Sequence, residues 1–427
     1  MKKSSIYLII TFTFLLLISI FLFNKQIFND KTNNGINVIK VLSLHKLTEE
    51  AKEAYTDNIK QIYPDYNISF DAVLDQQNDI RNEQELINRI KEKLKDDTYH
   101  IIVEIDEDLA FSLSKEGLLR NIHSSIKPLI KRYSILSNYS ESVPGNNPGE
   151  TYFIPIDFRG YCLIYNRDIF KRLNIKEPSQ TEDWDNIYKL SEMIEKKSNG
   201  AITPLTYGSN FPPLAFNEFL KYIAPLEIYL DSSGSSQKRL KDEWVKFIDN
   251  YKHYSMNVYD GAEFLRGNIA MEWVDTSTLF DDLLKQMEQG NLLGAKKFRY
   301  NVVSSPRFEG HSFYGMVDNV AVVPYNTPNY NISTGLINMF YTDHFVNSAY
   351  TSESVNLPIH ITKKLEDIYN QKDYKLDIFY PEKLKFSYTN YGNKIIFPGI
   401  TLMYDSIRGN ISPEDSLVEF QKVIKDN

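Results

Sequence analysis

The sequence predicts an α/β protein of two lobes with doubly wound sheets, preceded by a transmembrane helix. Three observations carry this prediction. Apolar strand-like segments alternate with charged amphipathic helices from residue 37 onward, an uncharged apolar run covers residues 6–23, and the chain that follows it is too long for one compact core. Strand–helix–strand units of this kind build mainly parallel sheets, which bind ligands at the carboxyl ends of their strands.

The N-terminal run predicts a membrane anchor. Lys2 and Lys3 precede residues 6–23, and Lys25 follows them. At ~1.5 Å per residue a helix over this run is just long enough to cross a bilayer core. No small residues suited to cleavage follow it, and no cysteine stands there to carry a lipid, so an uncleaved signal anchor (1–26) is favoured over a cleaved signal. The leading lysines keep the N-terminus in the cytoplasm, so a polar tether (27–36) and the rest of the chain are expected outside the cell membrane.

Composition narrows the class of protein. The net charge is −8 and no basic stripe occurs, which argues against a nucleic-acid partner. The single cysteine, Cys162, cannot form an intramolecular disulfide, which favours a bacterial cell surface or periplasm over a eukaryotic extracellular setting. It lies in an apolar segment, where an inert buried thiol is expected. The chain has no phosphate-binding glycine loop, dinucleotide turn or zinc-binding histidine pair, so no cofactor and no metal are predicted.

The expected elements follow from hydrophobic periodicity. The first third predicts strands at 38–44, 68–74 and 100–105, with helices at 49–62 and 83–95 between them. The middle predicts helices at 166–173, 183–197, 214–224, 240–254 and 277–288. A short strand at 319–323 and a helix at 332–345 come next, and a tail of Lys-rich and Tyr-rich segments begins at 361.

A series of segments carries a family resemblance. In order they are YFIPID (152–157), LIYNRDIFKRLNI (163–175), a helix start with Trp184 (178–190), FLRGNIAMEW (264–273), a return segment (306–324) and a final stretch at 352–358. This series resembles the family 1 extracellular solute-binding proteins of ABC importers, the group that includes the maltose-binding type. The resemblance covers most of residues 37–360. It departs from the family in lacking the lipid-anchoring cysteine and in its tail.

The resemblance implies a periplasmic-binding-protein-like fold whose two lobes close about a hinge. It places the first lobe at 37–158 and 305–360, the second at 159–304, and a helical region at 361–427 that packs on the second lobe. Pro155 restricts the chain to an extended form near the crossing, which suits closure about few residues. The implied function is capture of a small polar ligand, with sugar or oligosaccharide as the leading class, for delivery to ABC permease subunits. On this interpretation the protein is a monomer and not an enzyme.

Candidate ligand-binding residues are those that follow predicted strand ends or lie near the crossing. They are His45, Lys46, Asp75, Gln76, Asp106 and Glu107 in the first lobe, Asp157, Phe158 and Tyr161 near the crossing, Tyr207, Phe211, Trp273 and Asp275 in the second lobe, and Tyr314 and Asp318 on the return. In sugar-binding members the resemblance implies an aromatic platform with carboxylates that accept hydroxyl protons. Trp273 is the leading candidate for the platform, and a buried core tryptophan is the alternative.

The sequence leaves two other functions open. A ligand sensor that docks on a membrane receptor would use the same binding fold. A type II membrane glycosyltransferase would use Asp106 and Asp108 to hold a divalent metal, because paired carboxylates supply the hard oxygen ligands such ions prefer. The plainer interpretation of these aspartates is a charge at a helix N-terminus.

Overall fold

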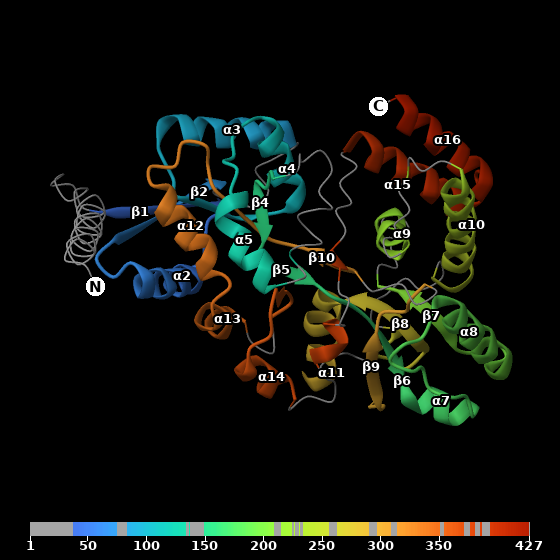
Figure 1. The fold of residues 1–427 in the computed structure, drawn as a ribbon. Coiled ribbons are helices and arrows are strands. Elements are labelled where there is room, and N and C mark those ends of the chain that lie inside the picture. The colour runs from blue at the N-terminus through green and yellow to red at the C-terminus, as the bar shows by residue number, and fades with distance from the viewer. Residues whose placement is uncertain are drawn as a thin grey trace, which may run out of the picture.

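The computed structural model of the chain (Figure 1) describes residues 37–74, 83–133, 136, 149–208, 215–223, 226, 230, 234–255, 263–289, 297–308, 314–350, 354–370, 376–380, 385–386 and 393–426. They form two α/β lobes joined by a small sheet. Within this part of the chain, no helix combines the length and apolar character that crossing a bilayer requires. The predicted anchor and tether lie outside the described residues.

The first lobe is built on a five-stranded sheet of order β2-β1-β3-β11-β4. Its strands are β1 (Val38–His45), β2 (Asn67–Leu74), β3 (Ile101–Ile105), β4 (Phe153–Pro155) and β11 (Val320–Val322). The first three pair in parallel, and β11 runs antiparallel to both β3 and β4. The sheet is therefore mixed, with its parallel part where the sequence predicts strand–helix–strand units.

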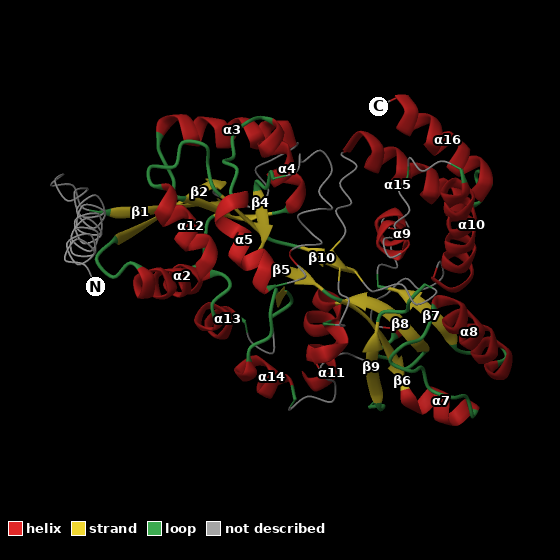
Figure 2. Ribbon diagram, viewed as in Figure 1, coloured by secondary structure: helices red, strands yellow, loops and turns green. Residues whose placement is uncertain are grey.

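Helices cover both faces of this sheet (Figure 2). They are α2 (Glu49–Ile62), α3 (Glu83–Asp96), α4 (Glu107–Lys115), α5 (His123–Arg132), α12 (Tyr330–Met339) and α13 (Asp343–Ala349). Local chemistry sets their starts: the hydroxyl of Thr48 accepts a hydrogen bond from the Ala51 amide and caps α2. The helix predicted at 332–345 is two helices, because Thr342 takes an extended conformation and caps α13 instead.

The second lobe carries a four-stranded sheet of order β7-β8-β6-β9. Its strands are β6 (Tyr161–Asn166), β7 (Thr203–Tyr207), β8 (Ile269–Asp275) and β9 (Tyr300–Ser304). Its helical segments are α7 (Arg167–Leu173), α8 (Trp184–Ser198), α9 (Ala215–Ile223), α10 (Ser235–Asn250) with a wider turn at Tyr251–Ser255, and Thr278–Leu284 running into α11 (Lys285–Gln289). All residues of β6 are buried, which agrees with the apolar strand expected around Cys162.

A third sheet lies between the lobes, and we call it the connecting sheet. Its order is β12-β5-β10-β13, from β5 (Asp157–Arg159), β10 (Tyr314–Val317), β12 (Leu357–Pro358) and β13 (Lys385–Phe386). The chain leaves the first lobe through β4 and β5, enters the second at β6, and returns through β9, β10 and β11. Gly160, which joins β5 to β6, has no room for a side chain, since a Cβ atom there would lie 2.8 Å from Cδ1 of Phe379.

The C-terminal helices lie beside the second lobe (Figure 1). After α14 (Lys363–Tyr369) and a turn at Leu376–Phe379, α15 (Asn393–Arg408) and α16 (Pro413–Asp426) pack on each other and on α9 and α10. The indole of Trp244 on α10 donates to Ser416 Oγ at 3.0 Å and stacks on Phe420. The residue numbers assigned to each lobe from the sequence stay predictions.

Candidate functional site

The strand ends of both lobes converge on the connecting sheet. In the first lobe, Ile105 at the end of β3 pairs with Val320, which lies three residues after β10 ends. In the second lobe, Asp275 at the end of β8 pairs with Tyr161, one glycine beyond β5. Because ligands bind at the carboxyl ends of parallel strands, the candidate site is the region where these two edges face each other.

Arg159 on β5 is the centre of this region. Its Nη2 lies 2.7 Å from Oδ1 of Asp318, in the turn between β10 and β11, and its Nη1 lies 3.9 Å from Oδ2 of Asp275, in the second lobe. Burial alone would lower the pKa of Arg159, but the two carboxylates outweigh it and raise the pKa, so the guanidinium stays charged. Asn356 donates to Asp318 Oδ2 at 2.7 Å, and Asp275 accepts from the Thr278 amide at 2.8 Å.

Asp157 begins the same strand and is almost fully buried. Its carboxylate accepts from the Asn319 amide at 3.0 Å, from Asn319 Nδ2 at 3.1 Å and from the hydroxyl of Tyr350 at 3.3 Å. Burial raises the pKa of Asp157 to about 7, and the nearby charge of Asp318 adds to the effect. The group is therefore held in place by several donors and titrates near neutral pH.

The first lobe contributes further acidic groups. Asp106 caps α4, its Oδ1 accepting from the Leu109 amide at 2.7 Å, as the plainer interpretation of this residue predicts. Burial raises the pKa of Asp106, and it raises the pKa of Asp108 to about 7, where Asp106 and Glu83 contribute too. Across the described residues, no group of three or more histidine, cysteine or acidic side chains is arranged to hold a metal ion.

One residue of β3 has an unusual backbone. Glu104 has a φ of 57°, in the left-handed region that non-glycine residues rarely adopt. Opposite it the pairing shifts, because three steps along β3 from Ile102 to Ile105 match two along β11 from Val322 to Val320. This is a β-bulge, a feature that re-aims side chains at the edges of sites. Burial raises the pKa of Glu104 to about 6.

The predicted aromatic platform lies inside the second lobe. Trp273 is 2% exposed, and its Nε1 donates to Ser305 Oγ at 2.9 Å. Its ring centroid is 5.0 Å from that of Tyr161 and 5.3 Å from that of Trp184 on α8. Tyr207 is fully buried, with its hydroxyl 3.1 Å from that of Tyr188. These rings share the sheet face that α8 covers, so the arrangement is that of a core.

The other candidates are spread along the site. His45 ends β1 and is half-buried, and Glu107 is a buried residue in the first turn of α4. Tyr314 lies in β10, paired with Lys385. Outside the described residues lie Asp75, Gln76 and Phe211. The ligand-binding roles of all the candidates named from the sequence stay predictions. Arg159 was missed, although an arginine two residues after Asp157 in an otherwise apolar crossing segment was a usable signal.

Comparison with known proteins identifies the family to which this fold and site belong. The model of the bacterial extracellular solute-binding protein family matches residues 46–329. The chain belongs to this family. Over 109 residues this solute-binding protein is 28% identical to the melibiose/raffinose/stachyose-binding protein of Bacillus subtilis (strain 168), a match that spans 25% of each chain. The resemblance predicted from the ordered segments is thereby confirmed.

Solved structures share the fold of the solute-binding protein. A sugar transporter from Rhizobium etli in an open conformation has a TM-score of 0.70 at 14% identity, covering 91% of this chain and 99% of that one. A cyclic alpha-maltosyl-1,6-maltose binding protein from Arthrobacter globiformis has a TM-score of 0.66 at 12% identity, covering 92% and 100%. A substrate-binding protein of Listeria monocytogenes in complex with cycloalternan has a TM-score of 0.61 at 14% identity, covering 92% and 99%. At these identities the likeness establishes the two-lobed α/β fold.

Proposed function

We propose that this solute-binding protein captures a sugar or oligosaccharide outside the cytoplasm, by closure of its lobes about the connecting sheet, and delivers it to an ABC permease. The observation that carries the proposal is the meeting of both lobes' strand ends at Arg159, Asp275 and Asp318. Polar side chains that donate and accept at such a meeting point suit a polyhydroxylated ligand, and binding without reaction needs only complementarity.

Relatives and the chemistry of the chain support this ligand class. The Bacillus relative is a melibiose/raffinose/stachyose-binding protein, and two of the similar structures are described by the cyclic oligosaccharides they bind. An enzymatic role finds no support in the cysteine, since Cys162 is fully buried and burial raises the pKa of its thiol well above the ordinary value. Asp106, required by the glycosyltransferase alternative, serves as a helix cap.

The apolar run at 6–23 indicates where the protein resides. We propose that it anchors a monomer to the cell membrane, with the lobes on the extracytoplasmic side. Mass spectrometry of protein extracted from membranes should find the N-terminal peptide still attached. A mature chain that starts between residues 24 and 34 would contradict the anchor.

Ligand binding is tested by thermal unfolding and calorimetric titration of the purified full chain. The probes are raffinose, stachyose, melibiose, maltose and galactose, with amino acids as controls. A sugar at 100 times its dissociation constant should stabilise the folded chain by about 2.7 kcal/mol. If no neutral saccharide at millimolar concentration shifts the unfolding midpoint, the proposed ligand class is wrong. Loss of uptake of the bound sugar on deletion of the chain would separate transport from a sensor role.

A further inference from the structure

The guanidinium of Arg159 has hydrogen-bonding capacity that the surrounding protein does not use. It carries five N–H donors in a fixed fork. Nη2 donates to Asp318 at 2.7 Å, Nη1 is 3.9 Å from Asp275 and so beyond hydrogen-bond distance, and the buried Nε has no hydrogen-bond partner among the described residues. The side chain is 34% exposed. The partly exposed guanidinium of Arg159 therefore offers the N–H groups of Nη1 as spare donors at the meeting point of the two lobes.

The charge around these donors is negative. One arginine faces two carboxylates, Asp275 and Asp318, and the charge of Asp318 also raises the pKa of Asp157 and of Asp106. On the second-lobe side, the cation of Lys221 (α9) lies over the ring of Tyr161. It is paired with Glu218 at 3.0 Å and so adds no net positive charge. A ligand that reaches Arg159 meets donors whose positive charge is already compensated.

We propose that Arg159 determines ligand class: it donates to hydroxyl or ring oxygens of an uncharged saccharide, while Asp275 and Asp318 disfavour anionic sugars such as uronic acids. This rests on the proposed function. A carboxylate on the ligand would gain little from an arginine already held by two aspartates, and it would be repelled by them. A hydroxyl oxygen accepts from the free N–H groups at no such cost.

Matched sugar pairs test the proposal on the full chain at pH 7.5 and low salt. The probes are glucose and glucuronate, galactose and galacturonate, and galactobiose and digalacturonate. For any pair that binds, calorimetric titration should give a dissociation constant at least tenfold lower for the neutral sugar than for its uronate. Asp275→Asn, which keeps a side chain able to cap the Thr278 amide, should narrow that preference at least threefold.

Arginine variants test the direct contact. Arg159→Met should weaken binding of the neutral sugar at least tenfold. Arg159→Lys keeps the positive charge but loses the forked guanidinium donors, so it should retain only part of the wild-type affinity. The matched control is Arg299→Met, which breaks an arginine–aspartate pair at the far end of β6 and should leave affinity unchanged. Unfolding midpoints establish that each variant is folded before titration.

The outcomes distinguish the proposed sugar-binding function from the proposed role of Arg159 in selecting neutral sugars. Uronates that bind as tightly as their neutral partners would overturn the inference about charge and leave a sugar-binding function standing. Wild-type affinity in Arg159→Met would overturn the contact role of Arg159. Failure of every sugar, neutral and anionic, to bind would overturn the proposed function and this inference with it.

Discussion

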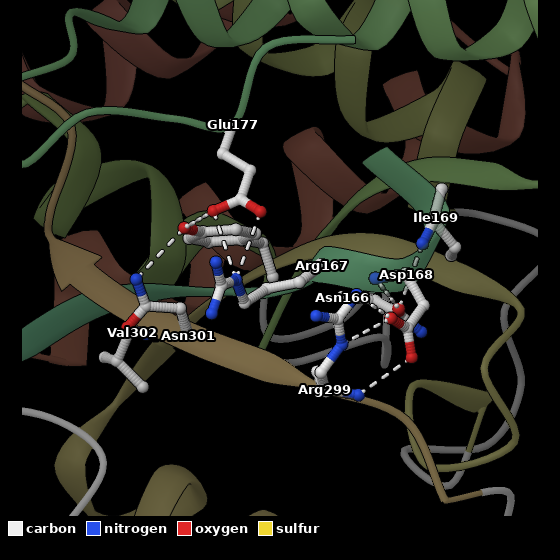
Figure 3. Close-up of polar contacts among 9 residues, drawn as sticks. Asn166, Arg167, Asp168, Ile169, Glu177, Arg299, Asn301 and Val302 are labelled. Atoms are coloured by element: carbon white, nitrogen blue, oxygen red, sulfur yellow. Dashed lines mark hydrogen bonds and ion pairs between the residues drawn. The ribbon is translucent and has the colours of Figure 1, made fainter. Parts of the chain in front are cut away.

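The two ends of strand β6 place arginines and carboxylates in different settings. At the outer end (Figure 3), Arg299 donates to Asp168 through Nε at 2.8 Å and through its backbone amide at 3.0 Å. Glu177 accepts from Arg167 Nε and from the hydroxyl of Tyr165. Each carboxylate there has its own arginine. At the inner end, by contrast, the single guanidinium of Arg159 lies beside two aspartates and keeps free donors.

The two ends of β6 also differ in how deeply their carboxylates are buried, and this strengthens the effect of the different ratio of carboxylates to arginines. Asp168 is 44% exposed, and the hydrogen bonds that its carboxylate accepts from the backbone amide and the side chain of Arg299 lower its pKa, as is usual for a paired surface carboxylate. Asp157 at the inner end is 7% exposed, and its pKa is raised. The outer end is a satisfied surface network. At the inner end, the protein leaves some hydrogen-bond donors unused and some charges unbalanced. A bound ligand could supply the missing partners.

The largest effect is expected close to the inner end. Trp273→Ala removes a ring enclosed by Tyr161, Trp184 and Tyr207 and leaves Ser305 without its donor. The free energy of unfolding should fall by ~3–5 kcal/mol, measured by the denaturant midpoint. Trp273→Phe, which keeps an aromatic ring, should lose less. A loss below about 1 kcal/mol, combined with weakened sugar binding, would restore Trp273 as a ligand platform.

The next effect is a pH dependence specific to Asp157. Its pKa is about 7 in the folded chain against an ordinary value of 3.8, so this group favours folding most at low pH, and its contribution is lost as pH rises through 7. As the pH rises from 5 to 8, the wild type loses this contribution and Asp157→Asn does not. The free energy of unfolding of the variant should therefore increase relative to that of the wild type, by on the order of 2–4 kcal/mol over this range. Denaturant melts at each pH measure the difference.

Comparison of variants isolates that titration. Asp108 and Glu104 also have raised pKa values, but both are present in wild type and variant, so they cancel in the difference. Asp168→Asn is the matched control at the outer end: its pKa lies below the ordinary value of 3.8, so the group is ionised in both the folded and the unfolded state and the difference from wild type should be flat between pH 5 and pH 8. An Asp157→Asn difference that is flat from pH 5 to pH 8 would show that Asp157 is ionised throughout.

A smaller loss is expected from Arg159→Met in the absence of ligand. The change removes a charged hydrogen bond to Asp318 and leaves that carboxylate beside Asp275 without compensation. A loss of ~1–3 kcal/mol in the free energy of unfolding should result, measured by denaturant melts at pH 7.5. Asp318→Asn combined with Arg159→Met should recover part of it. A neutral result would mean that solvent screens the inner end as it screens the outer one.

Local patterns predicted much of this architecture. The bounds of α2 agree with the predicted 49–62, because hydrophobic spacing and the cap at Thr48 are local signals. From the sequence, Asp275 is a candidate in the second lobe and Asp318 a candidate on the return, and the structure brings both to Arg159; their roles in ligand binding stay predictions. The burial of Trp273 could not be predicted, since it depends on which sheet face α8 covers, and that is decided by packing between segments far apart in sequence. Arg159 was missed for a related reason: its partners come from both lobes.

The smallest effect is expected at the outer end, where Arg299→Met breaks the pair with Asp168. Both side chains are about half exposed, at 57% and 44%, so water and salt screen their attraction and ordering two long side chains offsets most of it. The free energy of unfolding should change by less than about 1 kcal/mol, and less still in 0.5 M salt. A loss as large as that of Arg159→Met would mean that the two ends of β6 do not differ in the way their stoichiometry and burial indicate. A small loss beside a large one at Arg159 would show that burial together with the second carboxylate makes the inner end more sensitive, because both variants remove the same group from an aspartate at 2.7 Å.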